Sequence, residues 1–205
     1  MTQSSASDSA SEPLPASEQE RLGDTVARAR KGDQKAFTEL FACYHGPICT
    51  YLAHLVGNED VGRDLAQETF IRAWKGLQKL QGELLFRPWL YAIATNVARS
   101  HLQRERLPRW LSWGEYTRGI GATQAAPHAS EPGERLDEQE YIAEVLGALP
   151  PQCRTCLLLQ HVGGFSQREI AAILGISEKS VSAYVSRGRE QFRLIYRQLK
   201  GAPLS

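Results

Sequence analysis

The chain has 205 residues, with 24 Lys and Arg against 23 Asp and Glu, and a formal charge of +1. This balance argues against an extended basic nucleic-acid tail and against an acidic disordered protein. Domains commonly contain ~100–150 residues, so the length suits one domain or two small ones. No apolar run approaches the ~18–20 residues that a membrane-spanning helix needs. We therefore expect no direct membrane insertion.

The charge is distributed unevenly along the chain. Residues 1–20 carry a net charge of −4 and residues 108–140 carry −3, whereas residues 21–107 and 141–205 carry +4 each. The neutral total therefore conceals two basic blocks that alternate with two acidic ones.

Residues 1–20 are predicted to form a disordered tail. Serine and proline are frequent there, and large apolar side chains are almost absent. The segment also lacks the basic and apolar regions of a secretory signal. The protein is therefore expected in the cytoplasm, with its four cysteines as thiols.

Residues 21–107 show helical periodicity almost throughout. Between residues 60 and 80, apolar residues recur at the spacing of one helix face. A second helix is predicted over residues 87–106, after a short loop at 81–85. The opposite face of the first helix is polar, with Asp64, Gln67, Glu68, Arg72 and Lys75.

Residues 108–135 are predicted to form a flexible linker. Small residues and proline dominate this segment, and it is longer than a usual connection within one compact domain. Trp110 and Trp113 are expected to pack back on the first domain.

Residues 136–200 regain helical periodicity, with two helices predicted at 166–174 and 178–195. Ser166 and Glu169 have the spacing of a capping box, and Gly175 lies where the first of these helices must end. Two helices joined by so short a turn form a helix-turn-helix, whose second helix enters the major groove of DNA. The alternative is a helical hairpin with a solvated basic face.

Three segments carry a resemblance to a known family. DLAQETFIRAW at 64–74 and WLYAIATN at 89–96 resemble region 2 of extracytoplasmic-function (ECF) bacterial sigma factors, and GFSQREIAAILGIS at 164–177 resembles region 4. The blocks occur in the family's order, with a linker between them. The resemblance implies an all-α fold of two small helical domains, a helical bundle at 21–107 and a helix-turn-helix domain at 136–200.

The resemblance also implies a role for three sets of residues. The polar face of the 60–75 helix would dock on the β′ clamp helices of RNA polymerase, although an ordinary solvated face is the alternative. These residues are Asp64, Gln67, Glu68 and Arg72. The −10 element would be held by Arg87, Tyr91, Asn96, Arg99, Gln103 and Arg104. The −35 element would be bound by Ser166, Lys179, Ser180, Ser182, Ala183, Ser186 and Arg187.

The family's function is to bind core RNA polymerase, also through the β flap, and to direct initiation at promoter DNA under the control of an anti-sigma factor. The sequence departs from the family pattern at Leu84-Leu85, at Arg99-Ser100 and at residues 182–184, which leaves the promoter sequence open. A stand-alone DNA-binding regulator and a sigma-like decoy that binds polymerase without starting transcription are the alternatives.

Cys153 and Cys156 form a CxxC pair, which is compatible with half a zinc site or a redox pair. Cys43 with His45, or His161, would have to complete a metal site, and the sequence has no second CxxC. We therefore expect buried thiols, no metal and no cofactor, with redox sensing as the alternative. No catalytic motif is present, so the protein is not expected to be an enzyme.

Overall fold

The computed structural model describes residues 16–79, 85–105 and 138–200. In these three ranges the chain forms eight helices and no strand, which confirms the predicted all-α fold. Among the helices described, none combines the length and the apolar character that crossing a membrane requires.

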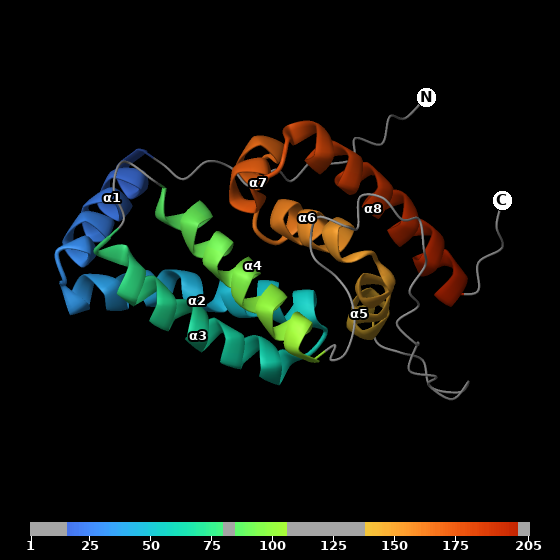
Figure 1. The fold of residues 1–205 in the computed structure, drawn as a ribbon, viewed down its shortest axis with the longest axis horizontal. Coiled ribbons are helices and arrows are strands. Elements are labelled where there is room, and N and C mark those ends of the chain that lie inside the picture. The colour runs from blue at the N-terminus through green and yellow to red at the C-terminus, as the bar shows by residue number, and fades with distance from the viewer. Residues whose placement is uncertain (1–15, 80–84, 106–137, 201–205) are drawn as a thin grey trace, which may run out of the picture.

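The first four helices form an N-terminal bundle (Figure 1). They are α1 (Ala16–Arg30), α2 (Gln34–Val56), α3 (Glu59–Leu77) and α4 (Phe86–Glu105). Helix α1 begins inside the segment predicted to be a disordered tail, so that prediction is wrong for residues 16–20. The start of α1 contains two glutamates, Glu18 and Glu20, and acidic residues favour the N-terminal end of a helix.

Side-chain caps fix the ends of the central helices of the bundle. The Asp33 carboxylate accepts hydrogen bonds from the backbone N–H of Lys35 at 2.9 Å and of Ala36 at 3.2 Å, which starts α2. Gly57, with φ +79°, ends α2, and the Asn58 side chain caps α3. These caps turn the chain back on itself and place α3 beside α2.

The bundle core is built around close packing of α2, α3 and α4. Tyr51 is fully buried, and its hydroxyl and that of Thr95 are hydrogen-bonded at 2.8 Å. Gly62 faces α2 so closely that a Cβ there would lie 2.7 Å from the Cα of Ala53. Glycine is therefore required where α3 crosses α2.

The remaining helices form the C-terminal domain. They are α5 (Glu138–Ala148), α6 (Pro151–His161), α7 (Gln167–Leu174) and α8 (Glu178–Leu199). The predicted helix-turn-helix corresponds to α7 and α8, and its last helix continues four residues beyond the predicted end. The capping box is confirmed, because Ser166 Oγ accepts from the Glu169 N–H and the Glu169 carboxylate accepts from the Ser166 N–H.

The two domains pack against each other, an arrangement that the sequence did not predict. Helices α5 and α6 contact α2, and α7 contacts α4 (Figure 1). The Arg154 guanidinium on α6 donates to the Leu55 carbonyl on α2 at 3.1 Å. The predicted linker, its two tryptophans and residues 81–84 of the predicted loop lie outside the described residues, and the domain boundaries stay predictions.

Candidate nucleic-acid and polymerase interfaces

Helix α8 has one buried side and one solvent-facing side. Val181, Val185 and Gly188 are buried, and a Cβ at Gly188 would lie 2.9 Å from Leu157 of α6. The solvent-facing side carries most of the predicted −35 residues, all exposed: Lys179, Ser182, Ala183, Ser186 and Arg187. The fold thus presents these side chains together on one rigid helix, as a major-groove contact requires.

Two other predicted −35 residues are engaged in capping. Ser166 is exposed, but its hydroxyl belongs to the α7 capping box. Ser180 is half-buried, and its hydroxyl is hydrogen-bonded to that of Ser177 at 2.8 Å. Both serine hydroxyls are therefore hydrogen-bonded at the start of their helices. A contact with DNA would have to leave these hydrogen bonds in place.

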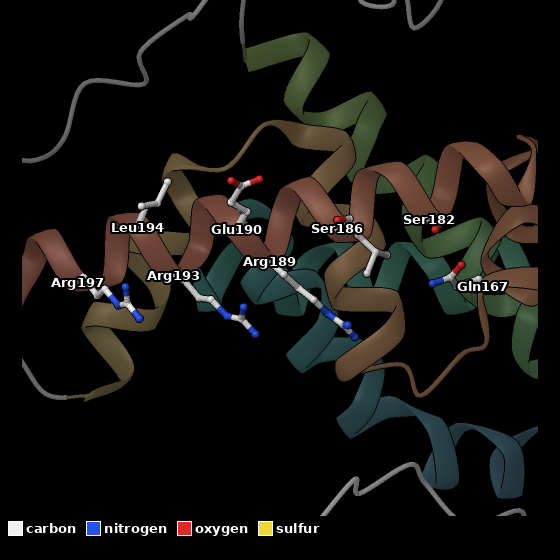
Figure 2. Close-up of a pocket in the computed structure, with 9 residues that line it drawn as sticks. Gln167, Ser182, Ser186, Arg189, Glu190, Arg193, Leu194 and Arg197 are labelled. Carbon is white, nitrogen blue, oxygen red and sulfur yellow. The ribbon is translucent and has the colours of Figure 1, made fainter. Parts of the chain in front are cut away.

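A row of arginines continues along the same helix. Figure 2 shows Arg189, Arg193 and Arg197 extending from the same side of α8. Together with Gln167 and Ser186 they line an open hollow of about 690 Å³. The four-residue spacing of these arginines predicts that they share one side of a helix, and they lie outside the −35 set predicted from the sequence.

The polar stripe of α3 is confirmed as a surface feature. Asp64, Gln67 and Arg72 are exposed, and Glu68 is half-buried and accepts from Arg72 at 2.6 Å. Ile71 lies next to them with 55 % of its surface exposed. Ile71 is four residues after Gln67 and four before Lys75, so the helical period places it on the polar face and adds one apolar side chain to the stripe.

The predicted −10 residues divide into two groups along α4. Asn96, Gln103 and Arg104 are exposed, and Arg99 is half-buried. Burial lowers the pKa of Arg99 from its ordinary value. These four residues on the C-terminal part of α4 therefore include the exposed polar side chains expected of a DNA-binding surface.

Arg87 and Tyr91, in contrast, lie at the junction of the two domains. The Arg87 guanidinium lies 4.4 Å from the centre of the Phe165 ring and donates a hydrogen bond to the Gly163 carbonyl. Tyr91 meets the Phe165 ring edge to face, with 4.9 Å between ring centres. Tyr91 is only 2 % exposed, and burial raises its pKa. In this arrangement Tyr91 is covered by the C-terminal domain and Arg87 is held by it, and their −10 role stays a prediction.

An apolar hollow of about 310 Å³ is a further feature that the sequence did not indicate. Ile142 and Leu146 of α5, Leu158 of α6 and Phe192 of α8 contribute its apolar lining. Basic groups also line it, namely His54, His161, Arg189 and Arg193. Burial, and then the Arg189 charge, lower the pKa of His161. The hollow therefore combines apolar walls with positive charge.

The cysteines are free thiols, and the predicted burial of Cys153 and Cys156 is confirmed. Cys43 is exposed and Cys49 is half-buried. Among the residues described, no three His, Cys, Asp or Glu side chains gather in a group that could hold a metal ion.

Comparisons with known proteins agree with this architecture. Residues 40–107 match sigma-70 region 2, and residues 139–192 match sigma-70 region 4. The ECF RNA polymerase sigma-E factor of Escherichia coli (strain K12) is 32% identical over 178 residues, which cover 83% of this chain and 93% of that protein. The probable RNA polymerase sigma factor RfaY of Xanthomonas campestris pv. campestris is 30% identical over 173 residues, and the match covers 84% of this chain but 43% of that longer protein.

Two solved structures are similar along most of the chain. CnrH in complex with the cytosolic domain of CnrY has a TM-score of 0.63 and 26% identity, covering 83% of this chain and 94% of that one. The sigma factor RpoE in complex with the anti-sigma factor NepR from Bartonella quintana has a TM-score of 0.60 and 23% identity, covering 80% and 98%, and supports the fold alone. With both sigma-70 regions matched in order, and a relative this similar over nearly its whole length, the chain belongs to the ECF sigma factors of RNA polymerase.

Proposed function

We propose that this sigma factor binds core RNA polymerase in the cytoplasm and directs it to promoters through a −10 and a −35 contact. The observation that carries the proposal is the exposed face of α8, a helix-turn-helix helix that is capped at its start and packed along its opposite side. The protein itself supplies binding and positioning, and the chemistry belongs to the polymerase.

The geometry of α8 limits which residues reach the bases. At 1.5 Å per residue its 22 residues extend over about 33 Å, whereas the major groove is only ~12 Å wide. The first turns, with Lys179, Ser182 and Ser186, would therefore face base edges, and Arg187 would reach the phosphates. With one cation among these base-facing residues, bidentate recognition of guanine is limited, and small side chains are available for thymine methyl groups.

The −10 contact is assigned to α4. Single-stranded DNA is bound by cations that follow the backbone and by polar or aromatic groups that hold unstacked bases. The exposed Asn96, Gln103 and Arg104, with the half-buried Arg99, supply the accessible part of such a surface. Arg87 and Tyr91 would join it once the C-terminal domain moves away.

The polymerase contact is assigned to the α3 stripe, with Ile71 as its apolar centre. A rigid helix face of carboxylates, an amide and one exposed apolar side chain suits a basic partner surface such as the β′ clamp helices. The β flap would be contacted by the C-terminal domain. CnrH was solved in complex with the cytosolic domain of CnrY, and RpoE in complex with the anti-sigma factor NepR. We therefore also propose that an anti-sigma factor controls this protein.

Run-off transcription with purified core polymerase on a genomic promoter library tests the proposal. We expect discrete transcripts from the wild-type protein, and a loss of at least tenfold for a Lys179→Ala, Arg187→Ala variant and for a Gln67→Ala, Ile71→Ala variant. The second variant should also lose core binding in a pull-down. Asp24→Ala on the exposed side of α1 is the control and should transcribe normally.

Two results would contradict the proposal. Stable core binding without any transcript would identify a polymerase-binding decoy. Specific duplex binding without core binding would identify a stand-alone regulator.

A further inference from the structure

The apolar hollow of about 310 Å³ lies where α5, α6 and α8 meet beside α2. Ile142 and Leu146 of α5, Leu157 and Leu158 of α6 and Phe192 of α8 form its apolar lining. The three leucines are buried, whereas Ile142 and Phe192 are half-buried and lie nearer to solvent. Burial of an apolar ligand group against such walls is favourable.

The rim of the apolar hollow is basic. Arg189 and Arg193 line it and also line the open hollow along α8, so these two side chains lie at the boundary between the hollows. Both are exposed, and Figure 2 shows them extending from the same side of α8. The exposed His161 of α6 and the half-buried His54 of α2 complete the polar part of the lining.

The positive charge at this rim is not balanced by neighbouring carboxylates. Within the part of the chain that the structure describes, neither Arg189 nor Arg193 takes part in an ion pair, and no aspartate or glutamate lines the apolar hollow. A carboxylate placed at the rim would therefore meet two guanidinium groups, which bind such anions through strong, charge-assisted hydrogen bonds.

The volume of the apolar hollow limits the size of its ligand. Each water occupies ~30 Å³ in the liquid, so 310 Å³ corresponds to about ten heavy atoms. Sites for small molecules usually have volumes of ~300–1,000 Å³, mostly apolar walls and a few polar groups that fix the orientation of the ligand. A short apolar chain with one anionic end therefore matches both the space and the charge.

We propose that the apolar hollow binds a medium-chain carboxylate, with the apolar chain between α5, α6 and α8 and the carboxylate on Arg189 and Arg193. The ligand is a free anionic amphiphile with a chain of about ten carbons. The inference goes beyond the proposed promoter function and does not depend on it, because none of the residues assigned to polymerase, −10 or −35 binding lines this hollow.

Three variants separate the charge at the rim from the apolar space. A double variant, Arg189→Gln with Arg193→Gln, removes both cations and keeps polar side chains. Ile142→Trp fills the hollow from α5 with a larger side chain. Arg197→Gln is the matched control, because Arg197 belongs to the same row on α8 but does not line the apolar hollow. Circular dichroism and thermal unfolding establish that each full-length variant is folded.

Isothermal titration calorimetry of the full-length protein is the first test, with decanoate below its micelle-forming concentration as the probe. We expect a single decanoate to bind, and decan-1-ol, which has the same chain without the charge, to bind at least tenfold more weakly. Acetate, which has the charge without the chain, should not bind at the same concentrations. The double arginine variant should bind decanoate at least tenfold more weakly, Ile142→Trp should lose binding, and Arg197→Gln should bind as the wild type does.

Methyl NMR during the same titration locates the ligand. The methyl resonances of Ile142, Leu146 and Leu158 should shift as decanoate is added, because these side chains line the hollow. Leu194 is the internal control, since it lies on α8 with 43 % of its surface exposed and does not line the apolar hollow. Its resonances should not move.

Three results would overturn the inference. The first is no decanoate binding by the wild type, and the second is equal binding by the wild type and the folded double arginine variant, or of decanoate and decan-1-ol, which would show that the charge is not used. The third is a shift of Leu194 without a shift of Leu158, which would show that decanoate coats exposed apolar side chains. The run-off assay contains no decanoate, so failure of the proposed function is distinguishable from failure of this inference.

Discussion

Cys153 and Cys156 lie three residues apart on α6, and both are buried. Burial raises the pKa of Cys153, and it raises the pKa of Cys156 to about 12. The thiolate is the form that reacts with electrophiles and binds metals. A buried thiol with a raised pKa is therefore a packing residue rather than a redox centre.

Thiol accessibility checks this interpretation. In the native protein at mildly alkaline pH we expect a disulfide reagent to modify Cys43 quickly and Cys49 more slowly, because burial raises the pKa of Cys49. Cys153 and Cys156 should react only after unfolding in urea. Mass spectrometry identifies the modified sites, and a Cys43→Ser variant should lose the fast phase. Rapid modification of Cys153, or a native Cys153–Cys156 disulfide, would instead favour the redox hypothesis.

Tyr51 makes the bundle sensitive to alkali. Burial raises its pKa above the ordinary value of 10.0, so its proton is held more tightly in the folded state than in the unfolded one. The resulting stability is fully present below pH 10.0 and is lost as the pH rises above it. Tyr51→Phe should lower the free energy of unfolding by about 1 kcal/mol at neutral pH, because the hydrogen bond to Thr95 is lost. The same substitution should make the decline of stability at high pH less steep.

Urea unfolding across the alkaline range measures this effect, with Tyr184→Phe in the other domain as the control. An identical alkaline decline in the wild type and in Tyr51→Phe would show that other groups cause it.

Helix α3 can approach α2 closely because of a single glycine. The space that a Cβ would need at Gly62 is taken by the backbone of Ala53, which cannot move without displacing α2. The crossing places the α3 stripe on the outer side of the bundle, so the proposed polymerase contact would depend on this packing.

Gly62→Ala should therefore destabilise the protein by about 1–3 kcal/mol through overpacking. The measurement is the free energy of unfolding in urea. Gly23→Ala is the control, because Gly23 is an exposed helix residue with nothing within 4 Å of an added Cβ, and alanine there should stabilise the helix by ~0.5–1 kcal/mol. Equal effects of the two substitutions would contradict the close-packing argument.

The capping box of α7 sets the start of the helix-turn-helix. Ser166→Ala removes the acceptor for the Glu169 N–H and should cost about 1 kcal/mol of stability. Ser182→Ala, at an exposed position of α8, should stay within ~0.5 kcal/mol of the wild type. Thermal unfolding compares the two, and a larger loss in Ser182→Ala would mean that the cap contributes little.

The whole molecule carries two regions of +4 charge, but it holds them against each other in a closed arrangement. A single domain of modest charge binds DNA weakly and depends strongly on salt. Polymerase would hold both domains at the promoter, so that the second contact forms at a high effective concentration.

We expect the holoenzyme to bind a promoter selected in the run-off assay ~100-fold more tightly than the free protein does. Anisotropy with labelled duplex at several salt concentrations measures both affinities, and Lys179→Ala should lower the salt slope of the free protein by about one. Equal affinities would show that the two domains do not depend on polymerase for joint binding.

Local signals were sufficient for much of the fold. Ser166, Glu169 and Gly175 predicted the limits of α7, because caps and left-handed turns involve neighbours in the sequence. The period of the 60–80 segment likewise placed Asp64 and Gln67 on the surface. The packing of Phe165 against Arg87 and Tyr91 could not be predicted in this way, because Phe165 lies more than seventy positions later in the chain.

The sequence alone determined the helices, the helix-turn-helix and the family of this protein, because periodicity, caps and motif spacing are all short-range properties. Tertiary structure alone decided which functional side chains are accessible. It left the α8 face and the α3 stripe exposed, and it packed Phe165 of the other domain against Arg87 and Tyr91. Accessibility depends on how the two domains meet, and no local pattern in either domain encodes that contact.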